Sequence, residues 1–255
     1  RDALMQDVAE AEFQIYEPNE DQEELAYQFR KYSLMTAPVV DPETGRLIGI
    51  VTADDVIDVI DEEAEDDMLK LAGLSGESDI FDSSFRTART RFTWLAVNLG
   101  TAVLASAVIA AFENAIQTLV ALAVLMPIVA SMGGNAGTQT LTVVVRAIAT
   151  KDITTATQWR FLLKELSVGL MNGLAFALIV AGCAYLWKQD LGLSLVIALA
   201  MLANLVIAAI FGTLIPLALD HFKIDPANAS GVFLTTVTDI IGFLAFLGLA
   251  SWLLL

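Results

Sequence analysis

The chain has 255 residues, of which 56% are hydrophobic, yet 14 basic and 30 acidic side chains give it a formal net charge of −16. Residues 1–85 hold 5 basic and 23 acidic side chains, and residues 86–255 hold 9 and 7. This asymmetry excludes one uniform soluble domain and predicts an acidic soluble module followed by a hydrophobic helix bundle. A single cysteine also excludes an internal disulfide.

Residues 1–60 carry the pattern of a small α+β domain. The segments "APVV" at 37–40 and "LIGIVT" at 47–52 are strand-like, and the turn "DPETG" separates them. Asn19 is expected to cap a helix before the strands, and Thr52 is expected to cap a helix after them. A unit of about 60 residues has a small core, so the domain is expected to pair with another copy.

An acidic helix is expected to connect this domain to the membrane part, with the connecting segment over residues 61–91. Nine of the 14 residues at 54–67 are acidic and none is basic. A solvated helix face is the ordinary explanation, but like charges four residues apart destabilise a helix. Divalent cations would supply the missing counter-charge, so these carboxylates are also candidates for a weak cation site.

Five apolar runs are long enough to cross a bilayer, which takes roughly 20 residues. The second run is too long for one straight span, and Pro127, Gly133, Gly134 and Gly137 lie within it. Irregular backbone or close helix contact is therefore expected there. The predicted fold is a membrane α-helical bundle of five spans within residues 92–255, near 92–112, 116–149, 161–187, 191–219 and 229–255.

Basic residues are distributed unevenly between the connections of these spans. Eight lie on one side, and only Lys188 lies on the other. This bias predicts an integral protein of the cell inner membrane with a cytoplasmic N-terminal module and an external C-terminus. The eight residues are Arg86, Arg89, Arg91, Arg146, Lys151, Arg160, Lys164 and Lys223.

Asp239 is the one acid in the last apolar run. A charged side chain at the centre of a bilayer costs roughly 2.5–3.5 kcal/mol, and such residues usually line an ion or proton path. By their spacing, Thr235 and Gly242 share its helix face, and Thr138 and Thr142 share a face of the second span. Threonine and glycine alone are also common in helix packing.

Oxygen donors without histidine or cysteine favour a hard cation, and Mg²⁺ gives up its water reluctantly. A lone carboxylate among hydroxyls therefore suits a cation held through its hydration shell. Two copies of Asp239 across a dimer axis would supply two negative charges. The predicted partners are a second copy of the chain, the bilayer and divalent cations, with no nucleic acid.

Three segments of the membrane half resemble the MgtE family of magnesium channels and transporters: "MPIVASMGGNAGTQTLTVVVRAIATKDI", "LLKELSVGLMNGLAFAL" and "IDPANASGVFLTTVTDIIGF". The segment "APVVDPETGRLIGIVTADDVIDVIDEEAEDDMLKLAGL" is similar to that family's second CBS domain and the connecting, or plug, helix after it. The resemblance covers essentially the whole chain in the family's order. The N-terminal domain and first CBS domain of the family are expected to be missing.

The resemblance implies a homodimeric channel whose pore is lined by the second and fifth spans and binds hydrated Mg²⁺ at Asp239. It also implies that cytosolic Mg²⁺ closes the pore, and that Thr52 and Asp55 form a T-x-x-D motif for the ribose of AMP or ATP. Family pore positions are matched by Gly134, Thr138, Thr142, Thr235 and Gly242. The matching regulatory acids are Asp55, Asp58, Glu63, Asp66, Asp67 and Asp225.

Two other functions stay open. One is an ion-coupled carrier for Mg²⁺ or another divalent cation such as Co²⁺. The other is a membrane-anchored sensor of ions or nucleotides that does not conduct. No enzyme is predicted, because the sequence contains neither a nucleophile–base pair nor a phosphate-binding glycine loop.

Overall fold

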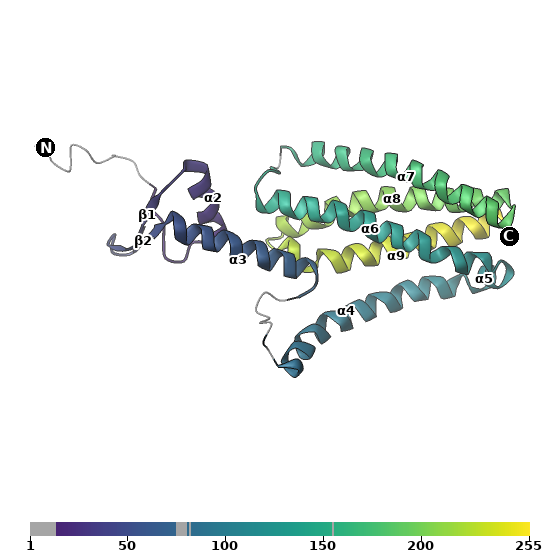
Figure 1. The fold of residues 1–255 in the computed structure, drawn as a ribbon, viewed down its shortest axis with the longest axis horizontal. Coiled ribbons are helices and arrows are strands. Elements are labelled where there is room, and N and C mark those ends of the chain that lie inside the picture. The colour runs from purple at the N-terminus through teal and green to yellow at the C-terminus, as the bar shows by residue number, and fades with distance from the viewer. Residues whose placement is uncertain (1–13, 75–80, 82, 155) are drawn as a thin grey trace, which may run out of the picture. The chain divides into compact units, whose positions relative to one another are not determined.

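The computed structural model describes residues 14–74, 81, 83–154 and 156–255. It divides into two compact units, Arg1–Asp66 and Asp67–Leu255. The predicted class, a small α+β domain followed by a helical membrane bundle, is confirmed (Figure 1). The domain boundaries at residues 60 and 91 stay predictions, and the division between the two units lies within helix α3 (Ala53–Leu71).

The first unit contains α2 (Gln22–Tyr32), strands β1 (Thr36–Val40) and β2 (Leu47–Thr52), and most of α3. The two strands pair antiparallel, with Thr36 opposite Thr52. α2 begins after Asp21, whose carboxylate accepts a hydrogen bond from the Glu23 backbone N–H at 2.9 Å. The prediction that Asn19 caps this helix is therefore wrong, because the carboxylate closer to the first turn satisfies its free N–H groups.

The core of the first unit is small, and its buried residues are Tyr16, Ala26, Phe29, Ala37 and Val56. Ile48 and Ile50 on β2 are each 60% exposed, and Ile57 on α3 is 59% exposed. So many exposed apolar side chains on so small a unit favour the expected pairing with another copy, which stays a prediction.

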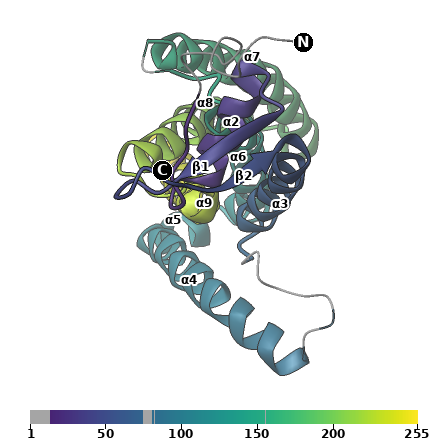
Figure 2. The ribbon, with the colours of Figure 1, turned by 90° about the vertical axis from the view of Figure 1, so that its left-hand side faces the viewer.

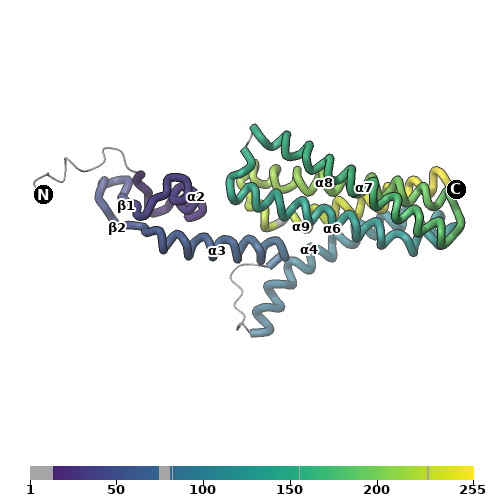
Figure 3. Tube along the Cα trace, turned by 45° about the horizontal axis from the view of Figure 1, so that its top comes forward, coloured from purple at the N-terminus to yellow at the C-terminus, as the bar shows by residue number. Residues whose placement is uncertain are grey.

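The second unit holds the five predicted spans, which are confirmed as helices long and apolar enough to cross a membrane within the described part of the chain. Neighbouring helices of the bundle lie alongside one another (Figure 3). They are α4 (Ser84–Ala111), α6 (Ala121–Ala149), α7 (Gln158–Lys188), α8 (Leu191–His221) and α9 (Pro226–Leu253), and the short α5 (Glu113–Thr118) precedes α6.

Helix α8 is the central helix of the bundle. It contacts α6, α7 and α9, and Ala200, Met201 and Ala208 on it are fully buried. Seen along the helices, α4 lies to one side of the other four (Figure 2), and of these it contacts chiefly α9. Most side chains of α4 are exposed, so much of its surface is left to face lipid or another protein.

The second span is interrupted at its start and not in its middle. α5 ends at Thr118, and α6 then runs without interruption from Ala121 through Pro127 and the glycines. The expectation of irregular backbone there is wrong, and the alternative of close contact is confirmed. A β-carbon added to Gly137 would lie 3.0 Å from the Leu234 side chain on α9, so the glycine serves packing between helices.

Gly169 on α7 is expected not to tolerate alanine. A β-carbon there would lie 2.7 Å from the Ala209 β-carbon and 3.1 Å from the Leu205 carbonyl oxygen, both on α8. Gly169→Ala should force α7 away from α8 and destabilise the protein by about 1–3 kcal/mol, as other overpacked cores are destabilised. Gly182→Ala on the same helix is the control, because nothing lies within 4 Å of a β-carbon there. Equal thermal unfolding midpoints for the two variants in detergent would contradict the tight packing.

Candidate functional site

A polar stripe on α6 is accessible on the surface of the single chain. It contains Gly134, Thr138 and Thr142, spaced four residues apart. The Thr138 hydroxyl donates to the Gly134 carbonyl oxygen, and the Thr142 hydroxyl donates to the Thr138 carbonyl oxygen, each at 2.9 Å. The hydroxyl hydrogens are therefore used within the helix, while the oxygen lone pairs remain available. The stripe thus offers acceptors, which suit the hydrogen atoms of water around a cation.

Helices α6 and α9 run antiparallel to each other (Figure 1). Leu234, in the first half of α9, packs in one cluster with Leu141 in the second half of α6. Phe246, in the second half of α9, packs in another cluster with Leu122 at the start of α6. Gly137 and Leu234 are in contact, so they lie at the same height along the two helices.

Thr235 and Asp239 extend the polar stripe onto α9. Thr138 follows the contact residue Gly137 by one position, and Thr235 follows the contact residue Leu234 by one. Because the helices are antiparallel, this one-residue rotation turns both threonines to the same side of the contact. Thr235 is exposed, and Asp239 one turn further along is partly buried. In the described part of the chain, no hydrogen bond or ion pair joins the Asp239 carboxylate to another residue.

Gly242 lies on α9 three residues after Asp239, but it is buried. A β-carbon added there would lie 2.8 Å from Nδ2 of Asn204 on α8. Because Gly242 has no side chain, α8 can approach α9 closely at this position. Helix packing therefore explains the glycine. Its place among the pore residues stays a prediction.

The two residues of the T-x-x-D motif, Thr52 and Asp55, are hydrogen-bonded to each other at the start of α3. The hydroxyl and the backbone N–H of Thr52 both donate to Oδ2 of Asp55, at 2.6 and 2.8 Å. These two bonds, the hydroxyl first, hold the pKa of Asp55 below its ordinary value. Thr52 thus precedes α3 as predicted, but the carboxylate of Asp55 accepts the hydrogen bonds. Nucleotide binding by this pair stays a prediction.

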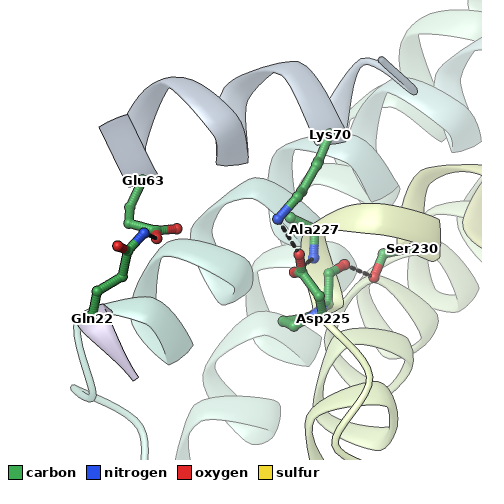
Figure 4. Close-up of polar contacts among 7 residues, drawn as sticks. Gln22, Glu63, Lys70, Asp225, Ala227 and Ser230 are labelled. Atoms are coloured by element: carbon green, nitrogen blue, oxygen red, sulfur yellow. Dashed lines mark hydrogen bonds and ion pairs between the residues drawn. The ribbon is translucent and has the colours of Figure 1, made fainter. Parts of the chain in front are cut away.

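The other predicted sensor acids lie along the length of α3. Asp58 is exposed, and Glu63, Asp66 and Asp67 are partly buried. Within the first unit, Nε2 of Gln22 donates a hydrogen bond to Glu63 (Figure 4). In the residues that the structure describes, no three His, Cys, Asp or Glu side chains come together as a group able to hold a metal ion. Within the described part of a single chain, these acids therefore do not form a site of three such ligands.

Asp225 is held by two contacts within the second unit. One oxygen accepts a hydrogen bond from the Ala227 backbone N–H at 2.9 Å and so caps α9. The other oxygen lies 2.6 Å from Nζ of Lys70, in the last turn of α3, and both side chains are only partly exposed (Figure 4). Lys70 therefore already supplies a positive charge where the sequence suggests a metal ion.

Two buried polar residues of the bundle have no role predicted from the sequence. Glu165 on α7 is 6% exposed and accepts a hydrogen bond from the Thr140 hydroxyl of α6 at 3.2 Å. Asn204 on α8 is fully buried and donates to the Val129 carbonyl oxygen of α6 at 2.8 Å. Both residues stand within or next to long apolar runs, which is the same signal that singled out Asp239.

Comparison with known proteins agrees with this architecture. Residues 126–249 match the family model MgtE, described as a divalent cation transporter, and residues 6–62 match the CBS domain model. The membrane match covers α6 to α9, which include both helices of the polar stripe.

Three curated relatives bear the name magnesium transporter MgtE. The protein of Bacillus subtilis is 36% identical over 233 residues, which are 91% of this chain and 51% of the relative. The protein of Enterococcus faecalis is 35% identical over 250 residues, 98% and 55% of the two chains, and that of Thermus thermophilus is 34% identical over 236 residues, 92% and 52%. The chain thus spans about half the length of the curated relatives it matches. With five apolar helices, a CBS domain and these matches, it is an integral membrane protein that belongs to the MgtE family of divalent cation transporters.

Proposed function

We propose that the chain forms the pore and regulatory parts of a Mg²⁺ channel that assembles as a homodimer in the cell inner membrane. The observation that carries the proposal is Asp239, a partly buried carboxylate within α9 with no protein partner in the described residues. It lies on the side of the α6–α9 contact where Thr138 and Thr235 are exposed. The name of the three relatives supports magnesium as the substrate.

The ion passes this site with its inner water shell in place. Mg²⁺ sheds water reluctantly and binds bare only where oxygens surround it in near-ideal octahedral geometry. One carboxylate per chain beside back-bonded threonines is too sparse for that, but it suits a hydrated ion. The O–H groups of the shell point outward and donate to the threonine oxygens, and two copies of Asp239 balance the charge of the ion.

Cytosolic Mg²⁺ closes the pore in this proposal, by binding acids of α3 and Asp225. The N-terminal module is on the cytoplasmic side, as the eight basic residues of the connections predict. Unbound, crowded carboxylates repel one another, and bound Mg²⁺ removes that repulsion. The ion shifts the equilibrium only as far as its affinities for the closed and open states differ, so several weak sites must act together.

The test is an ion-flux assay on the purified chain in liposomes that contain a Mg²⁺-sensitive dye. Channel function predicts Mg²⁺ entry down its gradient and discrete single-channel currents in planar bilayers. Flux without discrete currents, or flux that requires a second ion gradient, would favour a carrier. Absence of both flux and currents from a folded protein would favour the non-conducting sensor.

Lys70 is expected to compete with regulatory Mg²⁺ for Asp225. Its ammonium lies 2.6 Å from the carboxylate and is partly buried, so a metal ion must displace it. Lys70→Met should therefore lower the Mg²⁺ concentration that half-closes the channel by about two- to fivefold, the range of a partly exposed ion pair. Lys70→Arg, which keeps the charge, is the control. The competition is excluded if channel currents show Lys70→Met closing at the same or a higher Mg²⁺ concentration.

A further inference from the structure

Asn204 is a polar side chain at the centre of the bundle. It lies near the middle of α8 and has no exposed surface, the lowest exposure of any amide side chain in the described membrane helices. Its Nδ2 donates a hydrogen bond to the Val129 carbonyl oxygen of α6 at 2.8 Å. Its Oδ1 is buried and has no hydrogen-bond partner among the residues that the structure describes. An unpaired buried acceptor destabilises a folded protein, so an apolar side chain would serve the packing of α8 better.

The side-chain amide of Asn204 lies between two glycines, one on α6 and one on α9. A β-carbon added to Gly133 on α6 would lie 2.2 Å from Nδ2 of Asn204. A β-carbon added to Gly242 on α9 would lie 2.8 Å from the same atom. Both distances are too short for non-bonded atoms, so at each glycine the amide occupies the place of a side chain. One nitrogen atom therefore touches both helices of the polar stripe, and the width of the amide separates α6 from α9 at this point.

The hydrogen bond to Val129 holds the amide in this place. Exchanging the two amide atoms would put Oδ1 against the carbonyl oxygen, so only one orientation forms the bond. Val129 and Gly133 are four residues apart on α6 and therefore lie on one face of the helix. The nitrogen that is bound to α6 is also the atom that contacts α9 at Gly242. A bulkier side chain would push the two helices apart, and a shorter one would leave a void into which they would move.

This contact lies close to Asp239 along α9. Gly242 follows Asp239 by three residues, a rise of about 4.5 Å, which is less than one helical turn. Backbone hydrogen bonds join consecutive turns of a helix, so a movement of α9 relative to α6 at Gly242 also moves the backbone of Asp239. The position of the Asp239 carboxylate relative to the stripe on α6 therefore depends on the width of the group at position 204.

We propose that Asn204 is a spacer that sets the distance between α6 and α9, and with it the position of Asp239 in the ion path. Asn204 acts through the two helices and does not touch the ion, so it is a positioning residue. A hydrated cation contacts few protein oxygens, so its passage depends on where each of them stands. The inference rests on the proposed pore role of Asp239.

The experiment measures the single-channel conductance of the whole chain in planar bilayers. Asn204→Ala removes the spacer and should lose most of the conductance. Gly242→Ala alone should also lose conductance, because its methyl group would lie 2.8 Å from the amide nitrogen. In the double variant that methyl group lies next to the space that the amide has left, so Asn204→Ala with Gly242→Ala should recover much of the conductance. Such mutual rescue requires that the width of the group, and not its polarity, matters.

The control is Thr213→Ala, which shortens another fully buried side chain of α8. The Thr213 hydroxyl donates to the Ala209 carbonyl oxygen of its own helix at 2.9 Å. A residue with a purely structural role affects the unfolding temperature and the number of folded channels, but not the conductance of each channel. Thr213→Ala should behave in this way.

Normal single-channel conductance in Asn204→Ala overturns the inference. A double variant that recovers no conductance overturns it too, because polarity and not width would then explain the loss. If Asn204→Ala does not fold, Asn204→Ser takes its place, because serine also shortens the side chain and its hydroxyl can bond within α8. Absence of currents from the unmodified chain would instead refute the proposed function, so the two failures are distinguishable.

Discussion

Asp239→Asn is expected to lower Mg²⁺ flux through the reconstituted protein by about tenfold or more. The substitution keeps the size of the side chain and removes the one negative charge on the described exposed stripe of α6 and α9. A hydrogen bond to a charged group contributes about 1.5–3 kcal/mol, and 1.4 kcal/mol corresponds to a factor of ten. The measurement is the initial rate of Mg²⁺ entry into dye-loaded liposomes at equal protein density.

The matched control for this variant is Glu113→Gln on α5. It also removes one carboxylate, and Glu113 is exposed and accepts a hydrogen bond from Gln117 of the same helix at 2.9 Å. Its flux should equal that of the unmodified chain. Both variants should give the same oligomer size in detergent, because neither side chain supports packing between described helices. Normal flux in Asp239→Asn would refute the pore assignment.

Neutralising the five predicted sensor acids of α3 together should abolish most of the response to cytosolic Mg²⁺. These acids are Asp55, Asp58, Glu63, Asp66 and Asp67. Without their charges the repulsion that opens the pore at low Mg²⁺ is weaker, and closure at high Mg²⁺ loses its ligands. The two effects oppose each other at low Mg²⁺, so the quantity to measure is the change in open probability between low and high Mg²⁺. We expect that change to become small in single-channel recordings.

The same helix supplies a control with nearly equal loss of charge. Its four remaining acids, Asp54, Asp61, Glu62 and Glu65, are all exposed. Neutralising them should leave most of the response in place if specific ligands, and not the overall acidity of the helix, bind the ion. If the first variant keeps a steep response to Mg²⁺, the sensor lies elsewhere. If both variants lose the response equally, the acidic surface acts as a whole.

The number of spans and their apolar character are predictable from the sequence, because each depends only on residues that are near one another in the chain. A helix satisfies its own backbone in lipid, so a long apolar run is enough to determine where a span lies. The polar stripe was predictable in part for the same reason. Spacing alone places Thr138 and Thr142 on one face of a helix, and the exposed stripe contains both.

Features that depend on contact with a neighbouring helix are not all predicted correctly from the sequence. Pro127 and the glycines are typical of an interrupted helix, but α6 continues through them, and α8 packs closely against Gly133 and α9 against Gly137. Gly242 shares the helix face of Asp239 by spacing, yet Asn204 of α8 covers it. The cap at Asn19 failed for a local reason, since Asp21 lies nearer the first turn and accepts its hydrogen bond.

By itself the sequence determined that this is a five-span membrane protein with an acidic module before the spans. It also determined that Asp239 is the one acid in its span. Composition, hydropathy and helical spacing are local quantities, so they need no knowledge of the fold. Only the tertiary structure decided which groups have partners. Asp225 is paired with Lys70, Glu165 accepts the Thr140 hydroxyl, and Oδ1 of Asn204 has no partner in the described chain. Each of these outcomes depends on an approach between residues far apart in sequence, which helix packing and not local propensity brings about.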